Sequence, residues 1–157
     1  MTIKGLMIDP ITNMPIIVLK DDDGNHVLPI WVGVFEANAI ALQMENVQTP
    51  RPMTHDLLKN IIDDLNASVD RIVVCELKDN TFYATIHLSS GMGNLTVDSR
   101  PSDAIALALR TRSPIFVEEE VIESARSSAE SQDSSEIGRL QQWLEGLTEE
   151  QLGKYKM

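Results

Sequence analysis

The hydrophobic residues of this chain change their spacing in blocks, and this pattern restricts the fold more than any other feature. Residues 3–9, 14–20 and 26–32 are rich in branched apolar residues and are separated by Asp-Pro and Asp-Gly turns, which is typical of strands. Residues 35–47 instead space their apolar side chains three or four apart, as one face of a helix requires. Strands grouped before helices predict an α+β fold built on antiparallel or mixed meanders.

The second half of the chain repeats this order. A helix is expected to begin with Thr54 as its N-cap and to carry an apolar stripe of Leu57, Leu58, Ile61, Ile62 and Leu65. Residues 69–77, 81–88 and 95–98 then predict a second meander. A largely buried helix over 104–110, a short strand at 115–117 and a last element around 121–124 complete the expected domain. We therefore expect about three packed helices.

The expected domain boundary lies at residue 123. Residues 124–136 are rich in serine and lack large apolar side chains, so they predict a linker. Residues 137–157 contain spaced leucines that predict a short helical tail, which is too short to be stable alone and should dock on its own domain or on a partner.

Composition limits the classes of function. The formal net charge of the 157 residues is −11, which opposes binding to phosphate chains, so any contact with RNA or DNA should be weak and depend on a local basic site. Trp31, Phe35 and the other aromatic residues form no evident stacking platform in the sequence. The single cysteine excludes an internal disulfide, and no apolar run reaches the length of a membrane span. We expect a soluble cytoplasmic protein without a membrane partner.

Two segments combine an Arg-Pro pair with a helix start, at residues 50–57 and 98–110. Proline stiffens the approach to each helix, so Arg51 and Arg100 would be held near unpaired N–H groups of a helix N-terminus. A guanidinium beside such an N-terminus is a good setting for phosphate or carboxylate. The alternative is structural, in which Asp56 and Asp103 stabilise their helices and pair with the arginines internally.

Among the three histidines, His55 is the most interesting. The positive end of its helix disfavours the imidazolium, which would leave a neutral ring ready to accept a proton or bind a metal. Neighbouring helix residues do not face each other, so Asp56 cannot be its partner by spacing alone. Asp103 or Glu36 are the candidates.

The order of four segments is similar to that of a known family. LPIWVGVFEANAIAL at 28–42, PRPMTHDL at 50–57, TFYATIHL at 81–88 and DSRPSDAIALALR at 98–110 resemble the bifunctional nuclease domain family. This resemblance implies an α+β domain, a homo-oligomer, and an activity that degrades both RNA and DNA. It covers nearly all of residues 1–125.

The resemblance also singles out seven polar positions, namely Glu36, Arg51, His55, Asp56, Arg100, Ser102 and Asp103. The resulting hypothesis is a phosphodiester hydrolase in which the two arginines and Ser102 hold the phosphate and His55 acts as general base or acid. Glu36, Asp56 or Asp103 would orient His55 or hold a divalent cation, for which oxygen ligands favour Mg²⁺ or Mn²⁺.

Two other functions fit the same residues. The domain can be a non-catalytic oligomeric module that binds a small anionic ligand or a protein partner through its Arg-Pro motifs. It can also be a purely structural unit, in which these motifs lock helices at a subunit interface. The position of the arginines, in an open hollow or inside packed protein, separates these alternatives.

Overall fold

A computed structural model describes residues 1–130 and residue 144 of the chain. It confirms the α+β class. The first meander is a three-stranded antiparallel sheet of β1 (Thr2–Ile8), β2 (Pro15–Lys20) and β3 (Val27–Trp31), in that spatial order. Pro29 lies in β3 at the edge of this sheet, where a residue without an N–H donor is tolerated.

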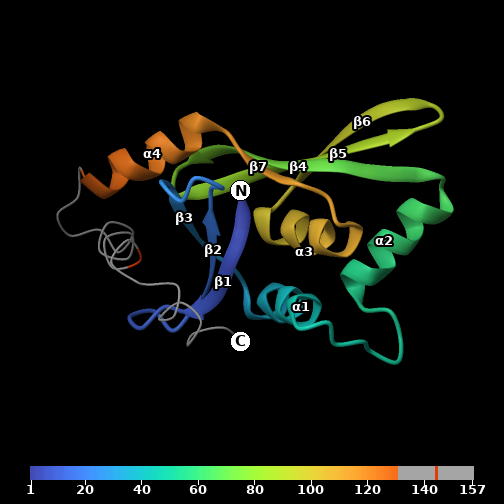
Figure 1. Ribbon diagram of the computed structural model, residues 1–157, viewed down its shortest axis with the longest axis horizontal. Helices are drawn as coiled ribbons and strands as arrows, with labels where there is room; N and C mark the ends of the chain where they lie inside the picture. The colour runs from blue at the N-terminus through green and yellow to red at the C-terminus, as the bar shows by residue number, and fades with distance from the viewer. Residues whose placement is uncertain (131–143, 145–157) are drawn as a thin grey trace.

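The second meander forms a mixed four-stranded sheet in the order β6-β5-β4-β7. It consists of β4 (Ala67–Lys78), β5 (Thr81–Ser90), β6 (Gly93–Ser99) and the short β7 (Ile115–Val117), which runs parallel to β4. The β5–β6 hairpin extends away from the body of the molecule (Figure 1).

Three helices follow the strands as the spacing predicts, and a fourth completes the described part. They are α1 (Val34–Met44), α2 (Thr54–Asp64), α3 (Pro101–Thr111) and α4 (Glu119–Glu130). Helix α3 is the central one: it packs on α1, on α2 and on one face of the four-stranded sheet (Figure 1). Its buried residues Ala104, Ile105 and Ala108 join the main core with Ile72, Val74 and Ala84 of β4 and β5. The predicted burial of this helix is confirmed.

The apolar stripe expected on α2 exists, but it faces outward. Leu57, Leu58, Ile61 and Leu65 are all exposed, and the only buried residue of the helix is His55. Leu95 and Val97 of β6 are also exposed. Burying the histidine instead of the leucines is the first sign that the beginning of α2 has a role other than packing.

Two boundaries differ from the sequence expectation. The cap of α2 is Met53 and not Thr54, because the carboxylate of Asp56 accepts the Met53 N–H at 3.0 Å and so satisfies the first turn. The linker prediction is wrong for residues 124–130, which continue α4; Val121 and Ala125, four residues apart, are both buried in the main core.

The predicted tail helix at 137–157 lies outside the described residues, apart from Leu144, which is buried beside Met7, Ile16 and Val18. The remainder of the predicted linker, residues 131–136, lies outside them as well. Within residues 1–130, no helix combines the length and the apolar character needed to cross a membrane.

Candidate functional site

The first turns of three helices meet in one polar cluster. Glu36 lies in the first turn of α1, His55 in that of α2 and Asp103 in that of α3, and Arg100 directly precedes α3. Each helix therefore contributes one side chain from the end where backbone N–H groups lack intrahelical partners and the dipole is positive. The fold brings together three segments that are far apart in the sequence.

Hydrogen bonds join these side chains in a row. The Nε2 atom of His55 lies 2.9 Å from Oδ1 of Asp103, while Nε of Arg100 donates to Oδ2 of the same carboxylate at 2.9 Å. Nη2 of Arg100 reaches Oε1 of Glu36 at 2.7 Å. Of the two partners proposed for His55 from the sequence, Asp103 is the one in contact.

Exposure differs sharply along this row. The side chain of His55 is 9% exposed and that of Asp103 is 29% exposed, whereas the Arg100 side chain is 66% exposed. The guanidinium thus faces solvent while its carboxylate partners hold it from behind. The position of Arg100 argues against the reading in which it is sealed inside packed protein.

The cluster changes the acidity of its own members. Burial raises the pKa of the Asp103 carboxyl, but the hydrogen bonds from Arg100 and His55 outweigh burial and leave this pKa below its usual value. The same contacts, with Asp103 first and Glu36 second, raise the pKa of Arg100. Asp103 is therefore ionised at neutral pH.

Gly33 at the N-cap of α1 leaves room for the Glu36 carboxylate, which folds back onto it. A Cβ atom at Gly33 would overlap with Oε2 of Glu36. Any larger residue would push this carboxylate away from its place beside Arg100. Gly33 is thus a positioning element that the sequence reasoning missed.

Asp56 belongs to a second cluster and not to the first. Its Oδ1 accepts a hydrogen bond from Nε of Arg110 at 2.6 Å, and the Arg110 side chain is only 5% exposed. The same guanidinium donates to the carbonyl oxygens of Ala106 and Ala39 at 2.8 and 3.0 Å, so it ties α3 to α1 and α2. Burial raises the pKa of Asp56, but the hydrogen bonds from Met53 and Arg110 outweigh it and the pKa is lowered.

A hollow of about 250 Å³ opens beside Arg100. Its wall includes Arg100, Ser102 and Gly33 together with the aromatic side chains of Trp31 and Phe82. Ser102 is only 6% exposed, and its hydroxyl has no hydrogen bond to the residues that the structure describes. A buried hydroxyl that lines a hollow without a protein partner is available to a ligand.

A second hollow, of about 280 Å³, is lined by Asp56, Arg110, Met53 and the loop before α2. The lining of neither hollow includes Arg51 or His55. Arg51 is exposed and makes no ion pair with any residue in the described part of the chain. The structure therefore brings together Glu36, His55, Arg100, Ser102 and Asp103, but not Arg51 or Asp56.

The exposure of one aromatic residue also differs from the sequence expectation. Phe35 in the first turn of α1 is 89% exposed and directly precedes Glu36. An aromatic ring in solvent offers a stacking surface that was not evident in the sequence.

The residues offered as metal ligands do not gather at one point. Arg100 lies between Glu36 and Asp103 and binds both, and Asp56 pairs with Arg110. Within the described residues, no three His, Cys, Asp or Glu side chains are placed to hold a metal ion together. The site as it stands is organised around a guanidinium.

Comparison with known proteins gives this cluster its context. The family model of the bifunctional nuclease domain matches residues 17–130, which include every member of the cluster. The chain belongs to the bifunctional nuclease domain family. Family membership agrees with the resemblance found in the four sequence segments.

Among the relatives of this family member is an uncharacterized protein of Mycobacterium tuberculosis, strain H37Rv. It is 40% identical over 123 residues, which are 78% of this chain and 73% of the relative. Bifunctional nuclease 1 of Arabidopsis thaliana is 35% identical over 108 residues, and bifunctional nuclease 2 of Oryza sativa subsp. japonica is 30% identical over 118. The matched region spans 33% and 36% of these two plant proteins.

Proposed function

We propose that this domain hydrolyses phosphodiester bonds of single-stranded RNA or DNA at the cluster around Arg100. The observation that carries the proposal is the pairing of an exposed guanidinium with the unpartnered, buried hydroxyl of Ser102 in one hollow. A fork of N–H donors, a hydroxyl and the N-terminus of α3 are together suited to a phosphate. The names of the plant relatives agree with a nucleic acid as the source of that phosphate.

Arg100 would bind the scissile phosphate and offset the charge that develops on it, and Ser102 would donate to a second oxygen. Glu36 and Asp103 fix the guanidinium from behind, so little conformational freedom is lost when the phosphate binds. These contacts would place the negatively charged phosphate next to Arg100, the most exposed side chain of the hydrogen-bonded row.

His55 would serve as the proton acceptor for the attacking water. Its Nε2 is bonded to Asp103, so Nδ1 is the nitrogen that would take the proton. The ionised Asp103 carboxylate would stabilise the resulting imidazolium. His55 is largely buried and lines neither hollow, so this step requires substrate or water to reach the ring through the first turn of α2.

Phe35 and the wall residues Trp31 and Phe82 would hold bases next to the phosphate. Stacking on an aromatic ring tolerates any base, which suits an activity on both RNA and DNA. Arg51, exposed on the loop before α2, would contact a flanking phosphate and would add affinity without chemistry. Because the whole chain carries a net charge of −11, we expect this binding to be weak, and because it depends on contacts between arginine and phosphate, we expect it to weaken further with salt.

The test compares cleavage of labelled single-stranded RNA and DNA by the wild type and by Arg100→Ala, Ser102→Ala and Arg126→Ala. Arg126 is an exposed arginine on α4 and serves as the matched control. We expect Arg100→Ala to lose at least about a hundredfold in kcat/KM and Arg126→Ala to retain full activity. Each variant is assayed with chelator and with added Mg²⁺ or Mn²⁺.

Cleavage that is unchanged in Arg100→Ala and Ser102→Ala would contradict the hydrolytic proposal. If instead inorganic phosphate binds the wild type and not Arg100→Ala while no cleavage is detected, the alternative of a non-catalytic module for anionic ligands is correct.

A further inference from the structure

A third hollow lies away from the Arg100 cluster. It measures about 540 Å³ and is formed by β4, β5, β7 and the residue that follows β7. This volume is in the range of sites for small organic ligands, whereas the two hollows described above are about half as large.

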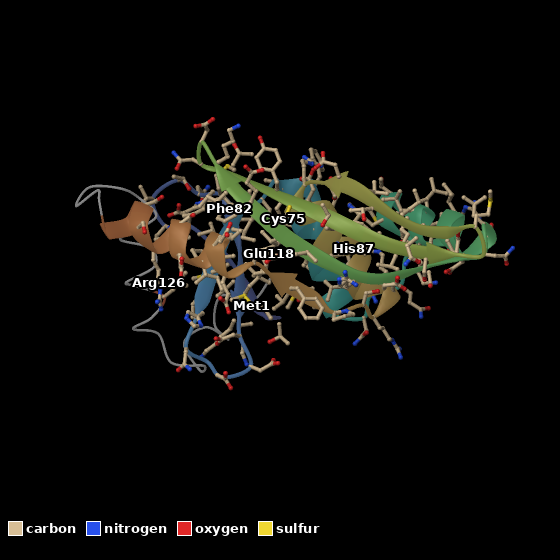
Figure 2. All side chains as sticks on the ribbon, turned by 90° about the horizontal axis from the view of Figure 1, so that it is seen from above. Met1, Cys75, Phe82, His87, Glu118 and Arg126 are labelled. Carbon is tan, nitrogen blue, oxygen red and sulfur yellow. The ribbon has the colours of Figure 1, made fainter. Side chains whose placement is uncertain are left out.

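The hollow lies on the face of the four-stranded sheet opposite to α3. Ile72 and Val74 of β4 point into the core with α3, so the alternating residues Arg71 and Val73 point to the other face. Figure 2 shows Cys75, His87 and Glu118 along these strands in the view onto this face. Neither His55 nor Asp103 contributes to the wall, so this site is separate from the proposed hydrolytic one.

The two ends of the hollow differ in chemistry. Arg71 and His87 are register partners on β4 and β5, and Nε2 of His87 lies 3.3 Å from the Thr85 hydroxyl, so one end gathers hydrogen-bond donors. Glu118 marks the other end, because its N–H bonds the Val74 carbonyl oxygen. Three residues of strand separate Arg71 from Val74, which is roughly 10 Å.

Neither charged group is neutralised by the protein. Within residues 1–130, the side chains of Arg71 and Glu118 form no ion pair or hydrogen bond, whereas Arg100 and Arg110 are both paired. A hollow with an unpaired cation at one end and an unpaired anion at the other fits a ligand that has an anionic group at one end and a hydrogen-bond donor at the other.

The floor between these ends is apolar and aromatic. Phe116 of β7 is the register partner of Val73, and its ring is 48% exposed. A flat ring in the ligand would stack on Phe116 between the two charged ends. Cys75 closes the wall, and burial raises the pKa of its thiol, so it contributes a neutral surface and no anion.

We infer that this hollow binds a nucleoside monophosphate whose base carries an exocyclic amino group. The phosphate would bind Arg71 and His87, the base would stack on Phe116, and the amino group would donate to Glu118. Guanine, adenine and cytosine present such a donor and uracil does not. This inference goes beyond the proposed hydrolysis, because the site would bind the nucleotide whether or not the domain cleaves nucleic acid.

The test titrates the full chain with GMP, AMP, CMP and UMP by calorimetry. We expect the three amino-bearing nucleotides to bind roughly tenfold more tightly than UMP, and Glu118→Ala, which removes the acceptor, to abolish this preference. Arg71→Ala should weaken all four nucleotides roughly tenfold, and Phe116→Ala should do the same. Arg126→Ala and Asp103→Asn should bind like the wild type.

Cys75 supplies an independent measurement. It is the only cysteine of the chain, so the rate at which a thiol reagent modifies the protein reports on this hollow alone. Saturating GMP should slow the modification several-fold in the wild type and leave it unchanged in Arg71→Ala.

Wild-type affinity in both Arg71→Ala and Phe116→Ala, or modification of Cys75 that GMP leaves unchanged, would overturn the inference. Equal affinity for GMP and UMP would overturn the assigned role of Glu118. Loss of nucleic-acid cleavage in Asp103→Asn with intact GMP binding would separate this site from the proposed hydrolytic function.

Discussion

The Nε2 atom of His55 lies 2.9 Å from Oδ1 of Asp103, although 48 residues separate the two in the chain. Both side chains project from first turns of helices, and α3 packs directly on α2. The contact therefore depends on the central position of α3 and not on local sequence. Arg100, which also binds Asp103, faces solvent and makes this partly buried pair part of a surface site.

Asp103 should make stability depend on acid pH. Because its pKa is lowered in the folded protein, its contribution is complete above the ordinary carboxyl pKa and is lost as the pH falls through the folded value. We expect Asp103→Asn to lower the free energy of unfolding by about 1–2 kcal/mol at pH 7 and by less at pH 3. Urea unfolding at several pH values measures this difference.

Asp63→Asn is the control for that series, since Asp63 pairs with Lys59 on the exposed side of α2. It should change stability by less than about 0.5 kcal/mol at any pH. An Asp103→Asn cost that stays the same at pH 3 and pH 7 would show that its carboxylate charge contributes nothing.

Arg110 should matter for stability more than any residue of the Arg100 cluster. Its buried guanidinium bonds Asp56 and two carbonyl oxygens, so Arg110→Ala leaves three acceptors without their donor. We expect a loss of about 2–4 kcal/mol, and a smaller loss for Arg110→Lys, by chemical unfolding. A loss below about 0.5 kcal/mol, like that expected for exposed Arg126, would contradict this role.

The negative charge of Glu36 should lower the affinity of Arg100 for anions. Removing its charge in Glu36→Gln leaves the guanidinium less neutralised, so inorganic phosphate should bind about threefold more tightly. Gly33→Ala should have a similar effect, because the new Cβ displaces the Glu36 carboxylate. Combining both changes should give no further gain in affinity. Weaker phosphate binding in either single variant would contradict this account of Gly33 and Glu36.

The exposed apolar stripe of α2 offers a test of the expected homo-oligomer. Leu57, Leu58, Ile61 and Leu65 form one exposed apolar surface, which a second copy of the chain would cover. We expect light scattering to show a dimer or larger species at micromolar concentration, and Ile61→Glu to shift it to monomer. Asn60→Glu on the same helix is the control and should stay associated. A wild-type monomer under these conditions would contradict the prediction.

Much of the fold follows from local pattern. Turn residues such as Asp23 and Gly24 and the alternation in β1 and β2 are properties of neighbouring residues, so the strands were predictable. The second half of α4 was not, because Ala125 and its serine neighbours are small and give no strong periodic signal, although small residues pack well against a core.

The site was predictable in part, because some of its features also follow from local sequence pattern. The Arg-Pro motifs indicated helix starts, and the partner of His55 was narrowed to two carboxylates. Arg110 was missed because an arginine at the end of a helix is expected to interact with the helix dipole, and only tertiary packing brings Asp56 to it. Arg51 lies outside the Arg100 cluster, because an Arg-Pro pair does not determine where the loop directs its side chain.

The central claim is that the Arg100–Asp103–His55 row performs phosphodiester hydrolysis, and Asp103→Asn tests it most directly. Wild type and variant are purified in parallel, and cleavage of single-stranded RNA is measured across each size-exclusion peak. The account predicts that wild-type activity follows the protein peak and that folded Asp103→Asn loses at least about a hundredfold in rate. Equal rates in the two proteins, or activity that does not follow the peak, would contradict it.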